Sequence, residues 1–148
     1  MDLSKLKLEA LTVNELTTLK QKMEEDLRVF LQTETNFMEL KKKYSASAVL
    51  VKNLVDSKDT PDDVMIPLSA SLFIPGQIKN KDKFIVDIGT GYFAERNGDQ
   101  TIAYCHQTNE VISSNLVGVR TEIQRKKTFL DQVNIQLQRQ VIKSRNLQ

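Results

Sequence analysis

The chain has 148 residues, of which only 6% are aromatic, and it contains no Trp, five Gly and three Pro. A compact globular domain of this length usually carries more large apolar side chains and turn residues, whereas 27% charged residues with few helix breakers are typical of long helices. Because 40% of the residues are hydrophobic and the net charge is only +2, intrinsic disorder is a poor fit. We expect one domain.

Cysteine usage and hydropathy indicate the compartment. The single cysteine, Cys105, has no partner for an internal disulfide, which favours a reducing environment. No apolar run approaches the ~20 residues that cross a bilayer, and residues 1–11 alternate leucines with charges, unlike a signal peptide. We therefore expect a cytoplasmic protein without membrane association. The pI near 8.6 is too mild to indicate a nucleic acid partner.

Residues 12–56 predict a first long helix. Thr12 and Glu15 stand three apart, as in a capping box, and Pro61 in the polar stretch that follows cannot continue the helix. Apolar residues recur every seven positions, and a second row three residues on includes polar members, which indicates a coiled-coil seam with polar interruptions. The first row is Leu16, Met23, Phe30, Phe37, Tyr44 and Val51, and the second is Leu19, Asp26, Thr33, Leu40, Ser47 and Leu54.

Residues 64–96 change to a period of two, which predicts two hairpins. Ile66 to Ile74 is expected to form one strand, which turns at Pro75-Gly76 into a short return strand around residues 77–79. A second hairpin is expected to turn at residues 89–91. Because two hairpins alone bury too little surface to be stable, we expect them to pair with strands of other chains. The expected assembly residues are Ile66, Leu68, Ala70, Leu72, Ile74, Phe84, Val86, Ile88 and Tyr92.

Residues 99–148 predict a second long helix, with Asp99 as its cap. Its seam alternates steps of three and four, through Ile102, Cys105, Asn109, Ile112, Leu116, Val119, Ile123, Lys126, Leu130, Val133, Leu137 and Gln140. Two helices of similar length joined by a compact β element are expected to pair antiparallel. The predicted fold class is thus α+β: a single unit over residues 1–148, with coiled-coil helices at 1–56 and 99–148 and the β-hairpin segment at 64–96.

The hairpin segment also carries a family resemblance. Residues 65–76, MIPLSASLFIPG, and residues 86–95, VDIGTGYFAE, resemble the α-class prefoldin subunits, as do DLSKL at residues 2–6 and NELTTLKQ at residues 14–21. This resemblance implies a hetero-hexamer of two α-class and four β-class subunits, in which the hairpins build a β-barrel hub. It implies a chaperone that uses no nucleotide and passes unfolded actin and tubulin to the cytosolic chaperonin.

The resemblance further places client contacts where the two termini meet at the ends of the helices. The expected client-binding residues are Leu3, Leu6, Leu8, Leu11, Val13, Leu16, Val141, Ile142 and Leu147. These apolar side chains are equally compatible with the ordinary end of a coiled-coil seam. A tether or adaptor that dimerises through its β segment is the alternative to the chaperone.

Patterns that would indicate an enzyme or a metal site fail on inspection. Gly89-Thr90-Gly91 lacks the third glycine and the following helix of a phosphate-binding loop. Cys105 and His106 point ~100° apart on a helix and cannot act as a nucleophile–base pair. The acidic residues from Asp59 to Asp63 lack the glycine and terminal Glu of a calcium loop. We therefore expect no catalysis, metal or cofactor. The basic bias of the second helix predicts a solvated face rather than a nucleic acid site.

Overall fold

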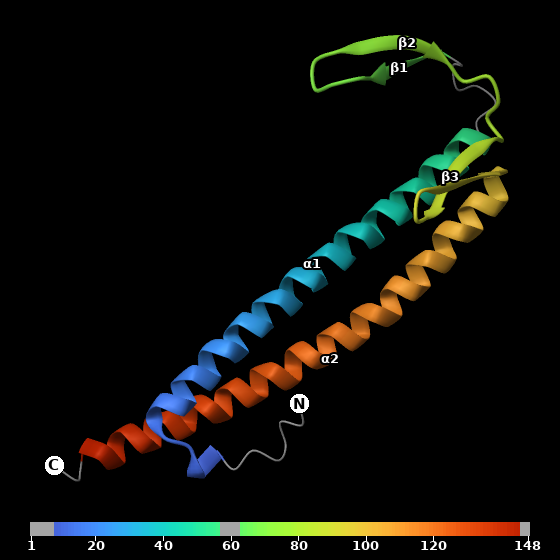
Figure 1. The fold of residues 1–148 in the computed structure, drawn as a ribbon. Coiled ribbons are helices and arrows are strands. Elements are labelled where there is room, and N and C mark those ends of the chain that lie inside the picture. Colours follow the sequence, from blue (N-terminus) through green and yellow to red (C-terminus); the bar gives the residue numbers. More distant parts are fainter. Residues whose placement is uncertain (1–7, 57–62, 146–148) are drawn as a thin grey trace. The chain divides into compact units, whose positions relative to one another are not determined.

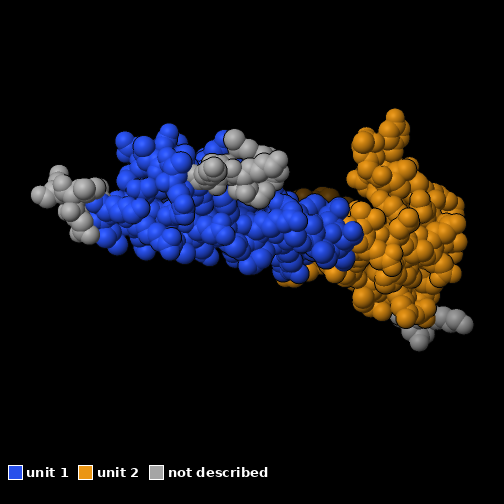
Figure 2. All heavy atoms as spheres, turned by 90° about the horizontal axis from the view of Figure 1, so that it is seen from below, with its two compact units in different colours: residues 1–39, 113–148 blue, residues 40–112 orange. Residues whose placement is uncertain are grey.

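The structure, a computed structural model, describes residues 8–56 and 63–145, with side chains described as far as Lys143. Two long helices, α1 (Val13–Asp56) and α2 (Gly98–Arg145), enclose a segment of short strands in the sequence (Figure 1). The predicted α+β class is confirmed. The chain divides into two compact units, residues 1–39 with 113–148 and residues 40–112 (Figure 2). Leu3, Leu6, Pro61 and Leu147 lie outside the described residues.

The predicted capping box begins α1. The backbone N–H of Thr12 donates to Oε2 of Glu15 at 2.8 Å, and the N–H of Glu15 donates to Oγ1 of Thr12 at 3.4 Å. These reciprocal bonds satisfy N–H groups that have no partner within the helix. The Thr12 backbone N–H, followed by its hydroxyl, lowers the pKa of Glu15 below its ordinary value of 4.5. A 3₁₀ turn, η2 (Leu8–Ala10), precedes this cap.

The core of the first unit lies between antiparallel stretches of α1 and α2. Leu16 and Val133 are fully enclosed, and Met23 and Phe129 complete the buried cluster. The predicted seam placed Leu130 in this layer, but Phe129 is buried and Leu130 only half-buried. Phe129 stands four residues before Val133, so both lie on one ridge of the helix, where the larger ring removes more apolar surface from water.

The buried side chains of the other unit are seam residues and two neighbours of the seam. They are Ala48, Val51, Thr101, Cys105 and Ile112. Thr101 is buried in place of the predicted Ile102, and its hydroxyl is satisfied because it donates to the carbonyl of Asn97 at 2.8 Å. Leu40 and Ser47, predicted for the second seam row, are both exposed. A helix has 3.6 residues per turn, so rows drawn every seven residues drift slowly around it. The two predicted rows therefore mark a wider stripe than the one that is buried in this unit.

Asn97, and not Asp99, caps α2. The side-chain oxygen of Asn97 accepts from the N–H of Gln100 at 2.9 Å, and the Asn97 N–H donates to Oε1 of Gln100 at 3.2 Å. Asp99 therefore lies inside the first turn, where its negative charge suits the positive end of the helix dipole. The Gly98 N–H donates to Oδ1 of Asp82 at 2.8 Å, which ties the loop before β3 to the start of α2.

The first hairpin is folded differently from the prediction. Strands β1 (Asp63–Pro67) and β2 (Phe73–Gln77) pair antiparallel, and the chain reverses at residues 68–72, not at Pro75-Gly76. Leu68 N–H donates to the carbonyl of Leu72 at 2.9 Å across this turn. Hydrogen-bonded pairs alternate with non-hydrogen-bonded ones along the ladder, so Pro67 and Pro75 both fall where no N–H is needed.

Gly76 serves the pairing of these strands rather than a turn. A Cβ at this position would lie 2.5 Å from Cδ1 of Ile66, so the bare glycine leaves room for that side chain. The predicted return strand at residues 77–79 is wrong because the small residues Ser69, Ala70 and Ser71 make the reversal instead. Ile66 lies opposite Ile74, and the apolar face predicted for one strand is kept across two.

The second hairpin has the predicted turn. Strands β3 (Phe84–Gly89) and β4 (Tyr92–Arg96) pair antiparallel around a two-residue loop in which Thr90 has φ 52° and Gly91 has φ 82°. Positive φ at both loop residues is the type I′ geometry that follows the twist of the strands. The register shifts between Asp87 and Gly89, and the Gly89 N–H donates to Oδ1 of Asp87 at 2.8 Å. The hairpin turn predicted for residues 89–91 is therefore confirmed.

Candidate assembly and client-contact sites

Both hairpins expose apolar side chains on strands that have one partner each among the described residues. Ile66 and Ile74 face each other across β1 and β2 and are both exposed. The other face of this hairpin also carries exposed apolar residues, Met65 and Phe73. Strands with unpaired edges and apolar side chains on both faces are stabilised when further strands pair with the edges and cover the faces. Of the predicted assembly residues, those that are exposed are Ile66, Leu68, Ala70, Leu72, Ile74, Ile88 and Tyr92.

The remaining two predicted assembly residues lie on the face of the second hairpin that carries Arg96, whose guanidinium lies over the Tyr104 ring of α2. Phe84 and Val86 are half-buried, and their cross-strand partners Arg96 and Ala94 share their face and their partial burial. The opposite face carries Ile85 and Phe93, which are 78% and 66% exposed. The apolar residues of this hairpin alternate between its two faces, as predicted. Because both faces carry apolar residues, the pattern alone does not show which of them becomes partly buried. Ile85 and Phe93 are thus candidate assembly residues that sequence reasoning missed.

A cluster of aromatic and charged residues holds the second hairpin on α2. The Tyr104 hydroxyl donates to the backbone carbonyl of Asp87 at 3.3 Å, and the Arg96 guanidinium lies 5.1 Å from the centre of the Tyr104 ring. Tyr44 of α1 meets that ring edge-on at 6.4 Å. Burial, with a smaller contribution from Tyr104, raises the pKa of Tyr44. The Ile85 and Phe93 face is therefore fixed outward by contacts on the opposite face of the same hairpin.

The first unit carries the predicted client-binding residues that the structure describes. Leu8 and Leu11 are half-buried against the core cluster, and Leu16 is wholly buried. Val13 and Val141 are half-buried, whereas Ile142 is 59% exposed. Direct contact through Leu16 requires the helix ends to open, but Ile142 is available as it stands.

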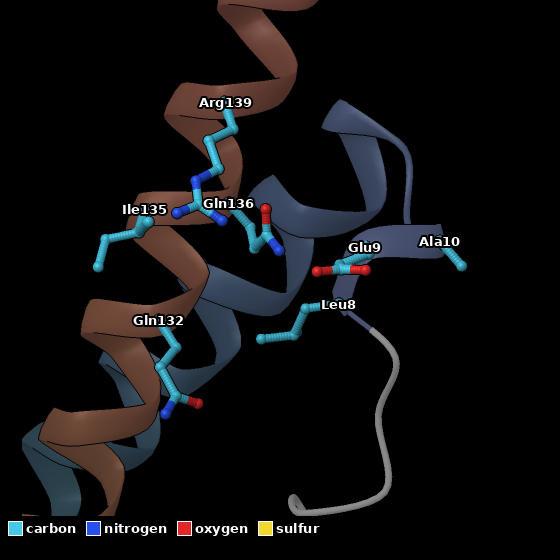
Figure 3. A pocket seen from close by; sticks show the side chains of 7 residues that line it. All are labelled: Leu8, Glu9, Ala10, Gln132, Ile135, Gln136 and Arg139. Carbon is cyan, nitrogen blue, oxygen red and sulfur yellow. The ribbon is translucent and has the colours of Figure 1, made fainter.

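A groove of about 740 Å³ lies between η2 and α2 in this unit (Figure 3). Leu8 extends from η2 toward α2, and Ile135, which is half exposed, supplies a second apolar side chain. The other lining residues are Glu9, Ala10, Gln132, Gln136 and Arg139. Ile135 lies off the heptad seam, and the seam pattern therefore gave no signal for it. Ile135 lines the groove because the turn η2 lies beside α2, and a helical pattern does not predict where such a turn lies.

The structure also places Cys105 and His106, the two residues considered as a nucleophile–base pair. Cys105 is buried, and burial raises the pKa of its thiol, which disfavours the reactive thiolate. His106 is exposed, so the predicted separation of the two side chains is confirmed. The described residues contain no group of three or more His, Cys, Asp and Glu that could hold a metal ion. No helix in the described part of the chain is long and apolar enough to cross a membrane.

Several cations of α2 are paired rather than presented as a free basic face. Arg120 Nε lies 2.6 Å from Oε1 of Glu34, and Lys126 Nζ lies 2.9 Å from Oδ2 of Asp26, both across the helix pair of the first unit. Arg125 pairs within α2 with Glu122 at 2.7 Å.

Antiparallel helices with two inserted hairpins define a class of coiled-coil proteins with a central β segment. The family model described as "Prefoldin subunit" matches residues 24–143, and the chain belongs to the prefoldin family of chaperone subunits. A relative from Arabidopsis thaliana named "Prefoldin subunit 5" is 28% identical over 138 residues, which cover 93% of this chain and 91% of that relative. "Prefoldin subunit alpha" of Thermofilum pendens is 27% identical over 67 residues, or 45% of this chain and 52% of that relative.

The fold is also similar to that of a solved structure. A chain from the cryo-EM structure of filamentous PFD from Methanocaldococcus jannaschii matches with a TM-score of 0.62 at 15% identity. The match covers 82% of this chain and 98% of the archaeal one. The predicted resemblance to prefoldin subunits is thus confirmed by the family match and by relatives named "Prefoldin subunit 5" and "Prefoldin subunit alpha".

Proposed function

We propose that this chain assembles through its hairpins with other prefoldin subunits, in a hetero-hexamer of two α-class and four β-class members. The observation that carries the proposal is the outward apolar surface of the second hairpin, where Ile85 and Phe93 are largely exposed while the opposite face is held on α2. A rigidly oriented apolar strand face in water costs free energy in proportion to its area. Strand pairing with a partner chain removes that cost and satisfies the open strand edges.

The assembled complex is proposed to hold non-native proteins, actin and tubulin among them, and to pass them to the cytosolic chaperonin without nucleotide or other cofactor. The proposal is supported by exposed Ile142 and by the groove beside Leu8, which offer apolar surface at the end of the first unit. Capture through several small apolar contacts needs no chemical step, in keeping with a non-catalytic protein. The proposed location is the cytoplasm.

Assembly is tested by placing a charge on the outward hairpin face. Ile85→Asp is expected to abolish or strongly reduce the complex formed with β-class partners, measured by native mass spectrometry, because the carboxylate would be desolvated in a strand interface. Leu50→Asp is the matched control, since Leu50 is an exposed apolar residue of α1 in the same unit. Equal assembly by both variants would overturn the hairpin interface.

Chaperone function is tested with the assembled wild-type complex. Denatured actin diluted into buffer should aggregate less in its presence, as measured by light scattering. A complex that assembles through the hairpins but leaves aggregation unchanged would favour the tether or adaptor. Removal of bound actin upon addition of cytosolic chaperonin would support delivery, and retention of actin would argue against it.

A further inference from the structure

The groove beside η2 is lined by amides as well as by apolar groups. Gln132 and Gln136 stand four residues apart on α2, and Gln140 continues the same row. Side chains four apart lie next to one another along a helix surface and form a ridge. The three glutamines therefore present their amides along one line, and two of them border the groove (Figure 3).

Gln140 indicates what this row of amides binds. Its Nε2 donates to the backbone carbonyl of Glu9 at 3.4 Å, so it holds a short irregular segment of this chain against α2. A glutamine amide carries two donors and one acceptor group, the same kinds of group as a peptide backbone. Among the described residues, the amides of Gln132 and Gln136 have no hydrogen-bond partner, and both can bind a backbone as Gln140 does.

The other lining residues restrict the kind of segment that fits. Leu8 and Ile135 offer apolar contact on either side of the amides. Glu9 and Arg139 bring one charge of each sign, so the groove has no net charge with which to attract a strongly acidic or basic ligand. An uncharged, extended segment with apolar side chains and unpaired backbone groups meets these conditions, and such segments occur in polypeptides that have not folded.

We infer that Gln132 and Gln136 bind the backbone of an extended, uncharged segment of a non-native polypeptide, while Leu8 and Ile135 contact its side chains. This inference rests on the proposed holding function and specifies its substrate class. Recognition through the backbone is independent of side-chain sequence, so one groove accepts many clients. A folded protein would not form these hydrogen bonds, because its backbone N–H and C=O groups are already paired.

The test uses the complete complex and a photoreactive peptide, so that adducts with this chain are counted apart from adducts with partner subunits. The probe is a neutral 12-residue peptide of Leu, Ser and Asn with a diazirine label, and its counterpart has esters in place of alternate amides. An ester has no N–H and its carbonyl is a weaker acceptor. Wild-type complex should label with the amide peptide at about tenfold lower concentration than with the ester, the effect expected for a few net hydrogen bonds.

Gln132→Met with Gln136→Met removes both amides while keeping side-chain length and helix propensity. This double variant should lose about tenfold in affinity for the amide peptide and keep the wild-type affinity for the ester. Gln138→Met is the matched control, because Gln138 is exposed on α2 but does not line the groove. Unchanged labelling of the double variant, or equal labelling by amide and ester in the wild type, would overturn the inference.

Two further outcomes have defined meanings. Tighter peptide binding after removal of residues 1–7, with no effect of the double variant, would mean that the chain's own N-terminal residues occupy the groove, and would overturn the inference. A wild-type complex that neither binds the peptide nor suppresses actin aggregation would overturn the proposed function together with it. If aggregation is suppressed by the wild type and by the double variant, with equal peptide labelling, the inference alone fails.

Discussion

The ammonium nitrogen of Lys126 lies 2.9 Å from Oδ2 of Asp26 and 5.1 Å from the centre of the Phe30 ring. Asp26 and Lys126 are the charged residues that interrupt the two heptad seams, and they meet each other across the helix pair of the first unit. The Lys126 side chain is only 12% exposed, whereas that of Asp26 is 42% exposed. The two partners therefore depend on the contact to different degrees, because the lysine has less access to water.

Asp26→Ala is expected to destabilise the first unit more than Glu34→Ala does. The first change leaves the enclosed Lys126 ammonium without its carboxylate, while the second leaves Arg120, which is more than half exposed, to water. An exposed pair such as Arg120 with Glu34 is worth about 1 kcal/mol or less. Hydrogen exchange over residues 113–130, measured by mass spectrometry in the assembled complex, reports the difference. Equal acceleration by the two variants would contradict the asymmetry.

The same contact predicts a pH dependence. Hydrogen bonding and charge attraction by Lys126 lower the pKa of Asp26 below its ordinary value of 3.8. The folded state thus binds a proton on Asp26 less readily than the unfolded state, so its stabilising contribution is complete above the ordinary pKa and is lost as pH falls through the lowered one. Asp26→Asn has no such proton to bind. Its stability should fall less than that of the wild type between pH 5 and pH 2, and parallel curves would count against the assignment.

The heptad pattern predicted the helices well because it depends on the polarity of each residue and of its near neighbours in the sequence. Thr12 and Glu15 capped α1 as predicted, and the charged seam residues Asp26 and Lys126 meet across the helix pair. The exchange of Leu130 for Phe129 in the core shows the limit of this reasoning. A period of seven fixes the side of the helix, while the choice between adjacent residues depends on the partner surface.

The β segment was harder to predict because several of its signals were ambiguous. Pro75 and Gly76 favour a turn by local propensity, yet they lie in a strand where Pro75 needs no N–H bond and Gly76 makes room for Ile66. Ile85 was missed because Phe84 and Val86 compete equally well for the outward face. For the groove, Gln132 and Ile135 look like ordinary surface residues until η2 is placed beside them.

Two helical glycines should respond oppositely to alanine. A Cβ at Gly98 would lie 2.5 Å from Cγ2 of Val55 and 3.2 Å from Oδ1 of Asp82, and the β-branched valine has little freedom to move. Gly98→Ala should destabilise the second unit by about 1–3 kcal/mol through overpacking. At Gly118 nothing lies within 4 Å of the added atom, and Gly118→Ala should stabilise α2 by about 0.5–1 kcal/mol through helix propensity.

Hydrogen exchange distinguishes these two effects by location. The Thr101 N–H, which donates to the carbonyl of Asn97 at 3.0 Å, should exchange faster in Gly98→Ala. In Gly118→Ala, the backbone amides that follow residue 118 should exchange more slowly, and the exchange of the Thr101 amide should not change. Protection of Thr101 that is unaffected by Gly98→Ala would mean that Val55 and Asp82 yield without cost.

The end of the first unit allows client contact to be separated from core packing. Ile142 is 59% exposed and Leu16 is fully buried. Burying the exposed part of an isoleucine is worth about 1–2 kcal/mol, so Ile142→Ser should weaken capture of denatured actin about fivefold to thirtyfold without changing hydrogen exchange in residues 13–23. Leu16→Ala should instead accelerate that exchange, because the lost side chain and the cavity together cost about 2–5 kcal/mol. If Ile142→Ser leaves capture intact while Leu16→Ala enhances it, clients contact the opened core and not the surface of the closed helix ends.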